Sequence, residues 1–272
     1  MAYQHILYAV DGPVARVTLN RPEVRNAQSR KLLEEMDAAF EAAVADPEVR
    51  VIVLAGVGDT FSAGHDLGSP EVRAEQAARP AQGLIGRFER IWDLYIDMGL
   101  RWRNLPKPTI AMVQGYCIFG GWMIATAMDL IVASEDAKFL ASHFQYFSVP
   151  YDVSPRKAKE LLFEFRFMHA DEAERTGMVN RVVPRERLEE ETMALARRIA
   201  LNDPFALRMA KFSINQAQDE MGYSTFIKAA SQTYMMTSES GAKELQDSDE
   251  GKRRRFSTVD RAIAYERERV RQ

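Results

Sequence analysis

The chain has 272 residues, of which 46% are hydrophobic, so it is long enough to enclose a core in one large domain. Thirty-six basic and 39 acidic residues leave a formal charge of −3, which excludes a general electrostatic attraction to nucleic acid or to an anionic membrane. Cys117 is the only cysteine, which excludes an internal disulfide, and the four histidines are too scattered to predict a zinc site.

The sequence gives no indication of export or membrane insertion. Residues 1–5 show no basic region followed by an apolar run, and no apolar stretch approaches the ~20 residues of a membrane span. We therefore expect a soluble cytoplasmic protein that binds neither membrane nor nucleic acid.

Short strands alternate with helices along the first two thirds of the chain, and the remainder is helical. Strands are predicted where apolar or β-branched runs lie between turn residues, at 6–10, 14–19, 50–55, 109–113, 130–133, 137–140 and 179–183. Helices are predicted where apolar residues recur three and four positions apart, at 29–44, 84–100, 122–128, 155–163, 170–176, 186–201, 204–219, 222–237, 241–247 and 258–271. This order predicts an α/β fold, with a core over 1–195 and a helical region over 196–272.

Two glycine-rich turns are the most informative features of the sequence. Residues 61–68 read Phe-Ser-Ala-Gly-His-Asp-Leu-Gly, and residues 115–122 read Gly-Tyr-Cys-Ile-Phe-Gly-Gly-Trp. Glycine beside small residues at the end of a strand lets the backbone turn sharply and leaves N–H groups without intrachain partners. Two such turns brought together could bind one developing oxyanion.

Four segments of the chain, in register, carry a resemblance to a known family. They are Asn-Arg-Pro-Glu-Val-Arg-Asn-Ala at 20–27, the Phe-Ser-Ala-Gly-His-Asp-Leu turn at 61–67, the Lys-Pro strand with its glycine turn and helix at 107–129, and Glu-Ala to Val-Val-Pro at 172–184. In order and spacing they resemble the crotonase superfamily, also called the enoyl-CoA hydratase/isomerase family, over about residues 5–250.

The resemblance implies a spiral of ββα repeats followed by a C-terminal helical region that mediates trimer formation. It implies an acyl-CoA substrate, so that coenzyme A enters as part of the substrate, with no permanently bound cofactor and no metal. The assembly would be a homotrimer or a dimer of trimers.

The resemblance also implies roles for particular residues. The main-chain N–H groups of His65 and Gly120 would hold the thioester carbonyl as an oxyanion hole. Coenzyme A would contact an arginine near its phosphates and a set of small or main-chain groups: Arg25, Ala27, Ala63, Asp66 and Leu67.

The chain departs from the family pattern where the acid/base groups belong. Met123 stands in place of one of two usual glutamates, and Phe119 replaces a usual glycine. Counting from the strand at 137–140 places His143 at the second glutamate position, in a segment that is shorter than usual, and Asp152 follows it. Both are candidate acid/base groups, although His143 could instead pack among aromatic residues and Asp152 could cap the helix that begins at Pro155.

These features predict an enzyme of the enoyl-CoA hydratase/isomerase type that stabilises a thioester enolate. Two alternatives remain open from the sequence. One is a hydrolase of the same superfamily, cleaving C–C or thioester bonds with His143 and Asp152. The other is a non-catalytic acyl-CoA binder, for which Met123 argues because a thioether cannot transfer a proton.

Overall fold

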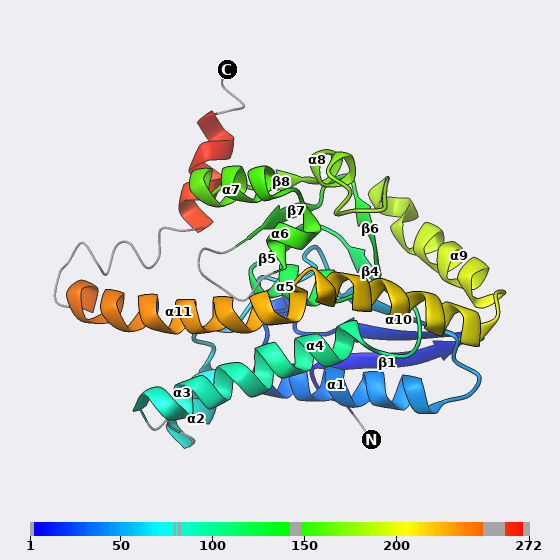
Figure 1. Cartoon of the computed structure of the whole chain (residues 1–272), viewed down its shortest axis with the longest axis horizontal. Helices are drawn as coiled ribbons and strands as arrows, with labels where there is room; N and C mark the ends of the chain where they lie inside the picture. Colours follow the sequence, from blue (N-terminus) through cyan, green and yellow to red (C-terminus); the bar gives the residue numbers. More distant parts are fainter. Residues whose placement is uncertain (1–2, 79, 81–82, 142–147, 247–258, 269–272) are drawn as a thin grey trace.

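The fold is built on a six-stranded sheet with a smaller sheet beside it (Figure 1). The computed structural model describes residues 3–78, 80, 83–141, 148–246 and 259–268. The large sheet has the order β1 (Ile6–Asp11), β2 (Val14–Leu19), β3 (Val51–Gly56), β4 (Thr109–Val113), β6 (Leu130–Ser134) and β9 (Arg181–Val183). The small sheet has the order β5 (Tyr116–Ile118), β7 (Lys138–Leu140) and β8 (Met168–His169). The β1–β2 hairpin is antiparallel, as predicted, and every later neighbour in the large sheet is parallel.

Helices cover both faces of the large sheet. Alternate residues of a strand point to opposite faces, and β3 shows this directly: Ile52 and Leu54 join the core cluster that contains α1 (Arg30–Ala45). Val51 and Val53 join the cluster that contains α9 (Leu188–Ala200). A strand covered on both faces must be apolar throughout, which is why the β3 sequence is a continuous apolar run.

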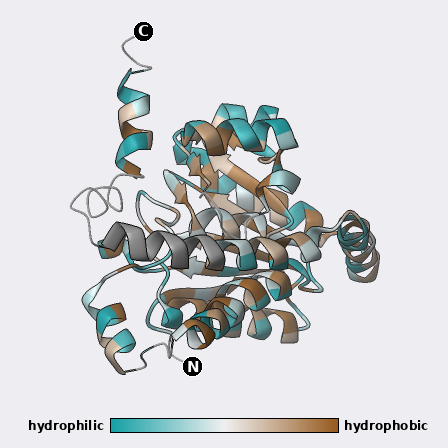
Figure 2. Cartoon of the chain, turned by 60° about the vertical axis from the view of Figure 1, so that its left-hand side comes forward, coloured by the Kyte–Doolittle hydropathy of each residue, from teal (hydrophilic) through white to brown (hydrophobic). Residues whose placement is uncertain are grey.

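The remaining helices surround this core, and most carry hydrophilic and hydrophobic residues on different sides of one ribbon (Figure 2). They are α2 (Pro70–Ala78), α3 (Gly83–Ile91), the π-helical turn η2 (Trp92–Asp97), α4 (Met98–Arg103), α5 (Gly120–Thr126), α6 (Val149–Asp152), α7 (Pro155–Glu164), α8 (Ala170–Arg175), α10 (Pro204–Glu220) and α11 (Tyr223–Gln246). Single-turn 3₁₀ helices lie at η1 (Pro22–Val24) and η3 (Arg185–Arg187), and residues 259–268 form a last helix. In the part of the chain that the structure describes, no helix is both long and apolar enough to span a membrane.

The structure corrects several sequence predictions. One continuous helix, α11, replaces the two helices predicted over 222–237 and 241–247. The segment at 70–80, where the sequence predicted no helix, contains α2. Only Val72 of α2 is buried, so this helix forms without an apolar face, and the search for apolar periodicity does not detect it. The predicted helix over 84–100 is present but passes through a π-helical turn, a feature that single-helix periodicity does not reveal. The predicted boundary between a core over 1–195 and a helical region over 196–272 stays a prediction. This boundary falls within α9.

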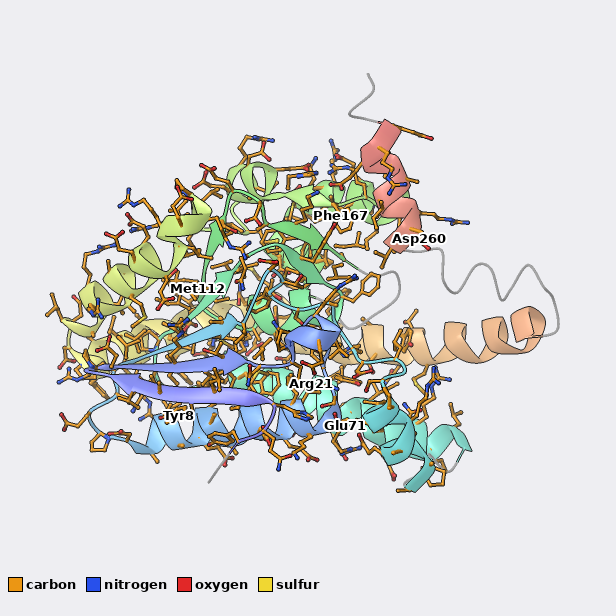
Figure 3. The ribbon with its side chains drawn as sticks, turned by 180° about the vertical axis from the view of Figure 1, so that it is seen from behind. Tyr8, Arg21, Glu71, Met112, Phe167 and Asp260 are labelled. Atoms are coloured by element: carbon orange, nitrogen blue, oxygen red, sulfur yellow. The ribbon has the colours of Figure 1, made fainter. Side chains whose placement is uncertain are left out.

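A buried arginine connects the loop at residues 20–27 with the loop at residues 61–68. Arg21 donates to the Asp66 carboxylate at 2.9 Å, to Glu71 at 3.0 Å and to the carbonyl of Ala27 at 2.6 Å, and its side chain is only 4% exposed. Figure 3 shows Arg21 and Glu71 close together at one end of the large sheet. Asp66 also accepts the N–H groups of residues 68 and 69, so its carboxylate organises the start of α2. The side chain of Asp66 therefore has a structural role in this loop.

Replacing Arg21 with Met should destabilise the protein strongly, because the buried Asp66 carboxylate would lose its charged partner. We expect the free energy of unfolding to fall by about 3 kcal/mol in a denaturant titration. The matched control is Arg175→Met, which breaks an exposed pair with Asp171 and should change that free energy by less than ~1 kcal/mol. Equal effects of the two substitutions would contradict a stabilising role for the buried pair.

Candidate functional site

Two loops far apart in the sequence lie side by side at the site. The Ala63 N–H donates to the Arg25 carbonyl at 3.0 Å, and the Gln28 N–H donates to the Gly64 carbonyl at 2.8 Å. The Asp66 N–H completes the ladder by donating to the Gln28 carbonyl at 3.0 Å. This short parallel bridge pairs Gln28 with His65. Because Gly64 and Asp66 supply the bonding groups on either side of it, the N–H of His65 points away from Gln28.

The other edge of the same loop pairs with β5. The Ser62 N–H donates to the Tyr116 carbonyl at 3.0 Å, and the Ile118 N–H donates to the Ser62 carbonyl at 3.0 Å. The 61–68 turn is thus held between the 25–28 loop and the strand that leads into Gly120. The two glycine motifs that the sequence singled out are brought together.

Glycine is required at both turns because the backbones touch. A Cβ on Gly64, whose φ is +88°, would lie 2.6 Å from the Ile118 carbonyl oxygen and 3.0 Å from the Gly120 nitrogen. A Cβ on Gly120 would collide with the Gln28 side-chain oxygen and lie 2.8 Å from two ring atoms of His65. A larger residue at Gly64 would push the two turns apart, and a larger residue at Gly120 would displace the side chains of Gln28 and His65.

Phe119 occupies the position before Gly120 in a conformation that favours glycine. Its φ of +50° and ψ of −107° are strained for a residue with a side chain. Its N–H donates to the Leu140 carbonyl at 2.9 Å, and its ring packs 6.3 Å from the ring of Phe165, so neighbouring contacts hold the strained turn. The replacement of the usual glycine thus leaves the turn intact at a cost in backbone strain.

The imidazole of His65 is buried against Tyr95, which the π-helical turn η2 carries. The two ring centroids are 3.9 Å apart with the planes inclined by 38°. Burial, helped by the positive charge of Arg90, lowers the pKa of His65 to about 3. The ring is therefore neutral near pH 7 and is a very weak base.

Asp152 is a buried carboxyl group with two neutral donors. The Trp122 indole N–H donates to it at 2.7 Å and the Ser148 hydroxyl at 2.6 Å. Burial raises its pKa to about 6, although both hydrogen bonds act in the opposite direction. The alternative role as a helix cap is wrong, since the Ser154 hydroxyl caps α7 by accepting the Lys157 N–H at 3.3 Å.

Comparison with known proteins shows the family of the chain. The sequence profile described as enoyl-CoA hydratase/isomerase matches residues 10–254. The chain belongs to the enoyl-CoA hydratase/isomerase family. It is 42% identical over 244 residues to the Mycobacterium tuberculosis protein named as enoyl-CoA hydratase EchA13, covering 82% of this chain and 77% of the relative.

Solved structures of this family superpose on the chain. A crystal structure named as a probable enoyl-CoA hydratase from Mycobacterium smegmatis has a TM-score of 0.81 and 42% identity, covering 88% of this chain and 96% of the other. An enoyl-CoA hydratase/isomerase from Xanthobacter autotrophicus Py2 has a TM-score of 0.78 and 35% identity, covering 86% and 87%. The fold is therefore the crotonase fold, and the chain is an enzyme of the enoyl-CoA hydratase/isomerase family.

The remaining residues that the resemblance implied lie around the paired loops. Arg25 is exposed in a left-handed conformation, and Leu67, in the second loop, is 89% exposed. Ala27 and Ala63 flank the bridge, and Asp66 contributes its N–H to it. His143 lies outside the described residues. Among the described residues, no cluster of three or more His, Cys, Asp or Glu side chains could hold a metal ion.

Met123 lines a cavity, and the sequence analysis did not identify the other residues that line it. The cavity has a volume of about 30 Å³ and lies beside Tyr95, Ser148 and Tyr223. These side chains come from η2, the start of α6 and the start of α11, and no short spacing relates them to the glycine turns.

Cys117, the single cysteine, is fully buried like a small apolar residue, and burial raises the pKa of its thiol.

An NMR titration of the ring resonances of His65 should show no protonation between pH 5 and pH 8. Its pKa of about 3 lies below the ordinary histidine pKa of 6.5, so the unfolded chain takes up this proton first. The associated stability is fully present above pH 6.5 and is lost as the pH falls from 6.5 towards 3. An inflection near pH 6.5 for this ring would contradict its burial against Tyr95.

Proposed function

We propose that the chain acts on acyl-CoA thioesters and holds the thioester carbonyl between the main-chain N–H groups of His65 and Gly120. The observation that carries this proposal is the contact between the two turns, in which Gly64 packs directly on the Gly120 nitrogen. Two main-chain donors fixed by surrounding backbone need no rearrangement when negative charge develops on an oxygen, which is what enolate formation requires.

The coenzyme A portion would lie along the paired loops. The exposed guanidinium of Arg25 suits a phosphate, which arginine binds in a bidentate manner. Ala27, Ala63 and the main chain of Asp66 and Leu67 supply small or backbone surfaces next to it, and the bridge between the loops holds them in one arrangement. The side chain of Asp66 is engaged by Arg21 and has no part in this proposal.

Asp152 is the acid/base candidate that the geometry favours. Its raised pKa of about 6 suits proton transfer near neutral pH, whereas the His65 ring is too weak a base and Met123 has no proton to give. Asp152 also borders a cavity of about 440 Å³ whose charged residues are Arg103, Asp129 and Lys211. A buried carboxyl group with this pKa suits reactions that proceed through an enolate, namely hydration or double-bond isomerisation, whereas hydrolysis by a His–Asp pair would also require His143, which lies outside the described residues.

We also propose that the chain assembles as a homotrimer or a dimer of trimers. The support is that α10 and the residue after it expose large apolar side chains, which water disfavours: Phe205, Phe212, Ile214 and Met221. Sedimentation equilibrium would test this directly, and a monomer at micromolar concentration would contradict it.

The proposed function is tested by incubating the protein with crotonyl-CoA, with a 3-enoyl-CoA, and with butyryl-CoA in D₂O. Hydration of the first, isomerisation of the second and exchange of the α-protons of the third all require the enolate-stabilising site. We expect exchange together with at least one of the two net reactions. Tight binding without exchange or turnover would favour the non-catalytic binder, and the absence of binding would reject the proposal.

Replacing Gly120 with Ala should reduce α-proton exchange at least ~100-fold, because the added methyl group collides with the side chains of Gln28 and His65 and so disturbs the residues that carry the two donors. The matched control is Gly12→Ala in the β1–β2 turn. Its positive φ of +55° makes the substitution cost about 1 kcal/mol of stability, while nothing lies within 4 Å of the new Cβ. Exchange by the Gly12→Ala protein should equal that of the wild type. Similar exchange rates for both variants would contradict the oxyanion role of Gly120.

Replacing Asp152 with Asn should reduce exchange by ~10²-fold or more and remove its pH dependence near pH 6. In the wild type the rate should fall about tenfold for each pH unit below 6, because the protonated carboxyl cannot accept a proton. The control Asp171→Asn alters an exposed aspartate bound to Arg175 and should leave the profile unchanged. A wild-type profile that persists in Asp152→Asn would assign the proton transfer to another group.

A further inference from the structure

The imidazole of His65 occupies the space that a side chain on Gly120 would need. A Cβ built on Gly120 would lie 2.8 Å from both Cε1 and Nδ1 of that ring, so these two ring atoms are within contact distance of the Gly120 Cα. The Nδ1 atom is hidden from solvent at this contact. The two residues whose N–H groups form the proposed oxyanion hole therefore touch each other through one side chain.

A second side chain packs on Gly120 beside the imidazole. Gln28 is the bridge partner of His65, and its side-chain oxygen also lies against Gly120. The Gln28 amide N–H donates to Ser62 Oγ at 3.4 Å, and that hydroxyl donates to the Asn26 carbonyl at 2.8 Å. The Gln28 side chain is thus held by a hydrogen bond of its own. Among these contacts on Gly120, the imidazole is the one that comes from a residue carrying an oxyanion donor.

Tyr95 packs on the same imidazole from η2. The two ring centroids are 3.9 Å apart and the planes are inclined by 38°, so the tyrosine ring covers one face of the imidazole. Gly120 must therefore contact the imidazole at its edge or on its other face. The His65 ring is confined between an aromatic ring and the main chain of the opposite turn, which leaves it little room to change its rotamer.

The π-helical turn brings Tyr95 to this position. Leu94 packs in the cluster that contains α1, Ile96 packs in the cluster that contains α11, and Tyr95 contacts both clusters. In a regular amphipathic α-helix consecutive side chains point about 100° apart, so three in a row do not all face the core. The helix after the turn is anchored to α1, since the Trp102 indole N–H donates to Asp37 at 2.7 Å. Tyr95 is therefore carried by a segment with fixed contacts on both sides.

We propose that the His65 side chain is a spacer that sets the separation of the two oxyanion donors, and that Tyr95 is the positioning residue that holds this spacer against Gly120. The proposal rests on the proposed function above. An N–H group binds an oxyanion well only at an N···O distance of about 2.9 Å, so a small change in the separation of the donors weakens at least one hydrogen bond. The main-chain hydrogen bonds fix the 61–68 loop, and the ring fixes its distance to Gly120.

The spacer acts through its shape. With a pKa of about 3 the His65 ring is neutral near pH 7, so it adds no charge beside the donors. Tyr95 contacts the imidazole with its ring, and the phenol oxygen is not needed for that contact. A phenylalanine at position 95 should therefore hold the spacer, whereas an aliphatic side chain, which cannot stack, should not.

The test measures α-proton exchange of butyryl-CoA in D₂O. Tyr95→Leu, and His65→Ala, which keeps the main-chain N–H, should each lower the exchange rate about tenfold or more. The dissociation constant for butyryl-CoA should stay within about threefold of the wild-type value, because the developing oxyanion depends on the spacing more than the bound thioester does. Tyr95→Phe should recover most of the rate that Tyr95→Leu loses.

The double variant shows whether Tyr95 acts through His65. In the His65→Ala protein, which has already lost the spacer, adding Tyr95→Leu should cause no further loss of exchange. The control is Tyr8→Leu, which removes a ring that packs against Tyr3 in the N-terminal part of the chain and should exchange at the wild-type rate.

Three results would overturn the spacer and leave the proposed function standing. They are exchange by Tyr95→Leu within about threefold of the wild type, an equal loss from Tyr95→Leu in the His65→Ala protein, and a loss of butyryl-CoA binding in parallel with the loss of exchange. A wild-type protein that does not exchange butyryl-CoA would overturn both proposals, so the two failures are distinguishable.

Circular dichroism shows which variants fold. If His65→Ala does not fold, the pair Tyr95→Leu and Tyr95→Phe decides, and equal rates for that pair would reject the spacer. If Tyr95→Leu does not fold, His65→Ala decides, and a wild-type exchange rate for that variant would reject the spacer.

Discussion

The direct backbone contact between Gly64 and Gly120 is the constraint on which the site depends. The two turns approach so closely that a single methyl group on either residue has no room. Hydrogen bonds on both sides of the 61–68 loop produce this approach, one set to the 25–28 loop and the other to β5. Main-chain donors held in this way lose little freedom on binding an oxyanion, which is the physical basis of preorganised electrostatic stabilisation.

The contact also explains why the protein tolerates two unfavourable features nearby. Phe119 remains in a strained conformation because Leu140 and Phe165 hold it from outside the turn. Arg21 is buried with its charge because Asp66, Glu71 and a carbonyl group all bind it. Both features keep the loops in register, so the protein loses some stability in return for a fixed geometry at the site.

The sequence predicted the parts of this arrangement that depend on local chemistry. The hairpin, the buried strands and the glycine turns follow from short patterns, and the spacing of four segments was sufficient to identify the family. The acid/base side was harder to predict because its contacts are not local. Asp152 receives a hydrogen bond from Trp122, 30 positions earlier, and its other donor, Ser148, lines a cavity together with Tyr223, 75 positions later in the chain than Ser148. Tyr95 reaches His65 only because a π-helical turn carries it, and periodicity alone does not reveal such a turn.

The most direct test of the central claim is a crystal structure with a non-reactive acyl-CoA analogue. The account predicts the carbonyl oxygen of the analogue within about 3 Å of the main-chain nitrogens of both His65 and Gly120. A carbonyl group bound elsewhere, or held by only one of these nitrogens, would contradict the claim that the two glycine turns form one oxyanion hole.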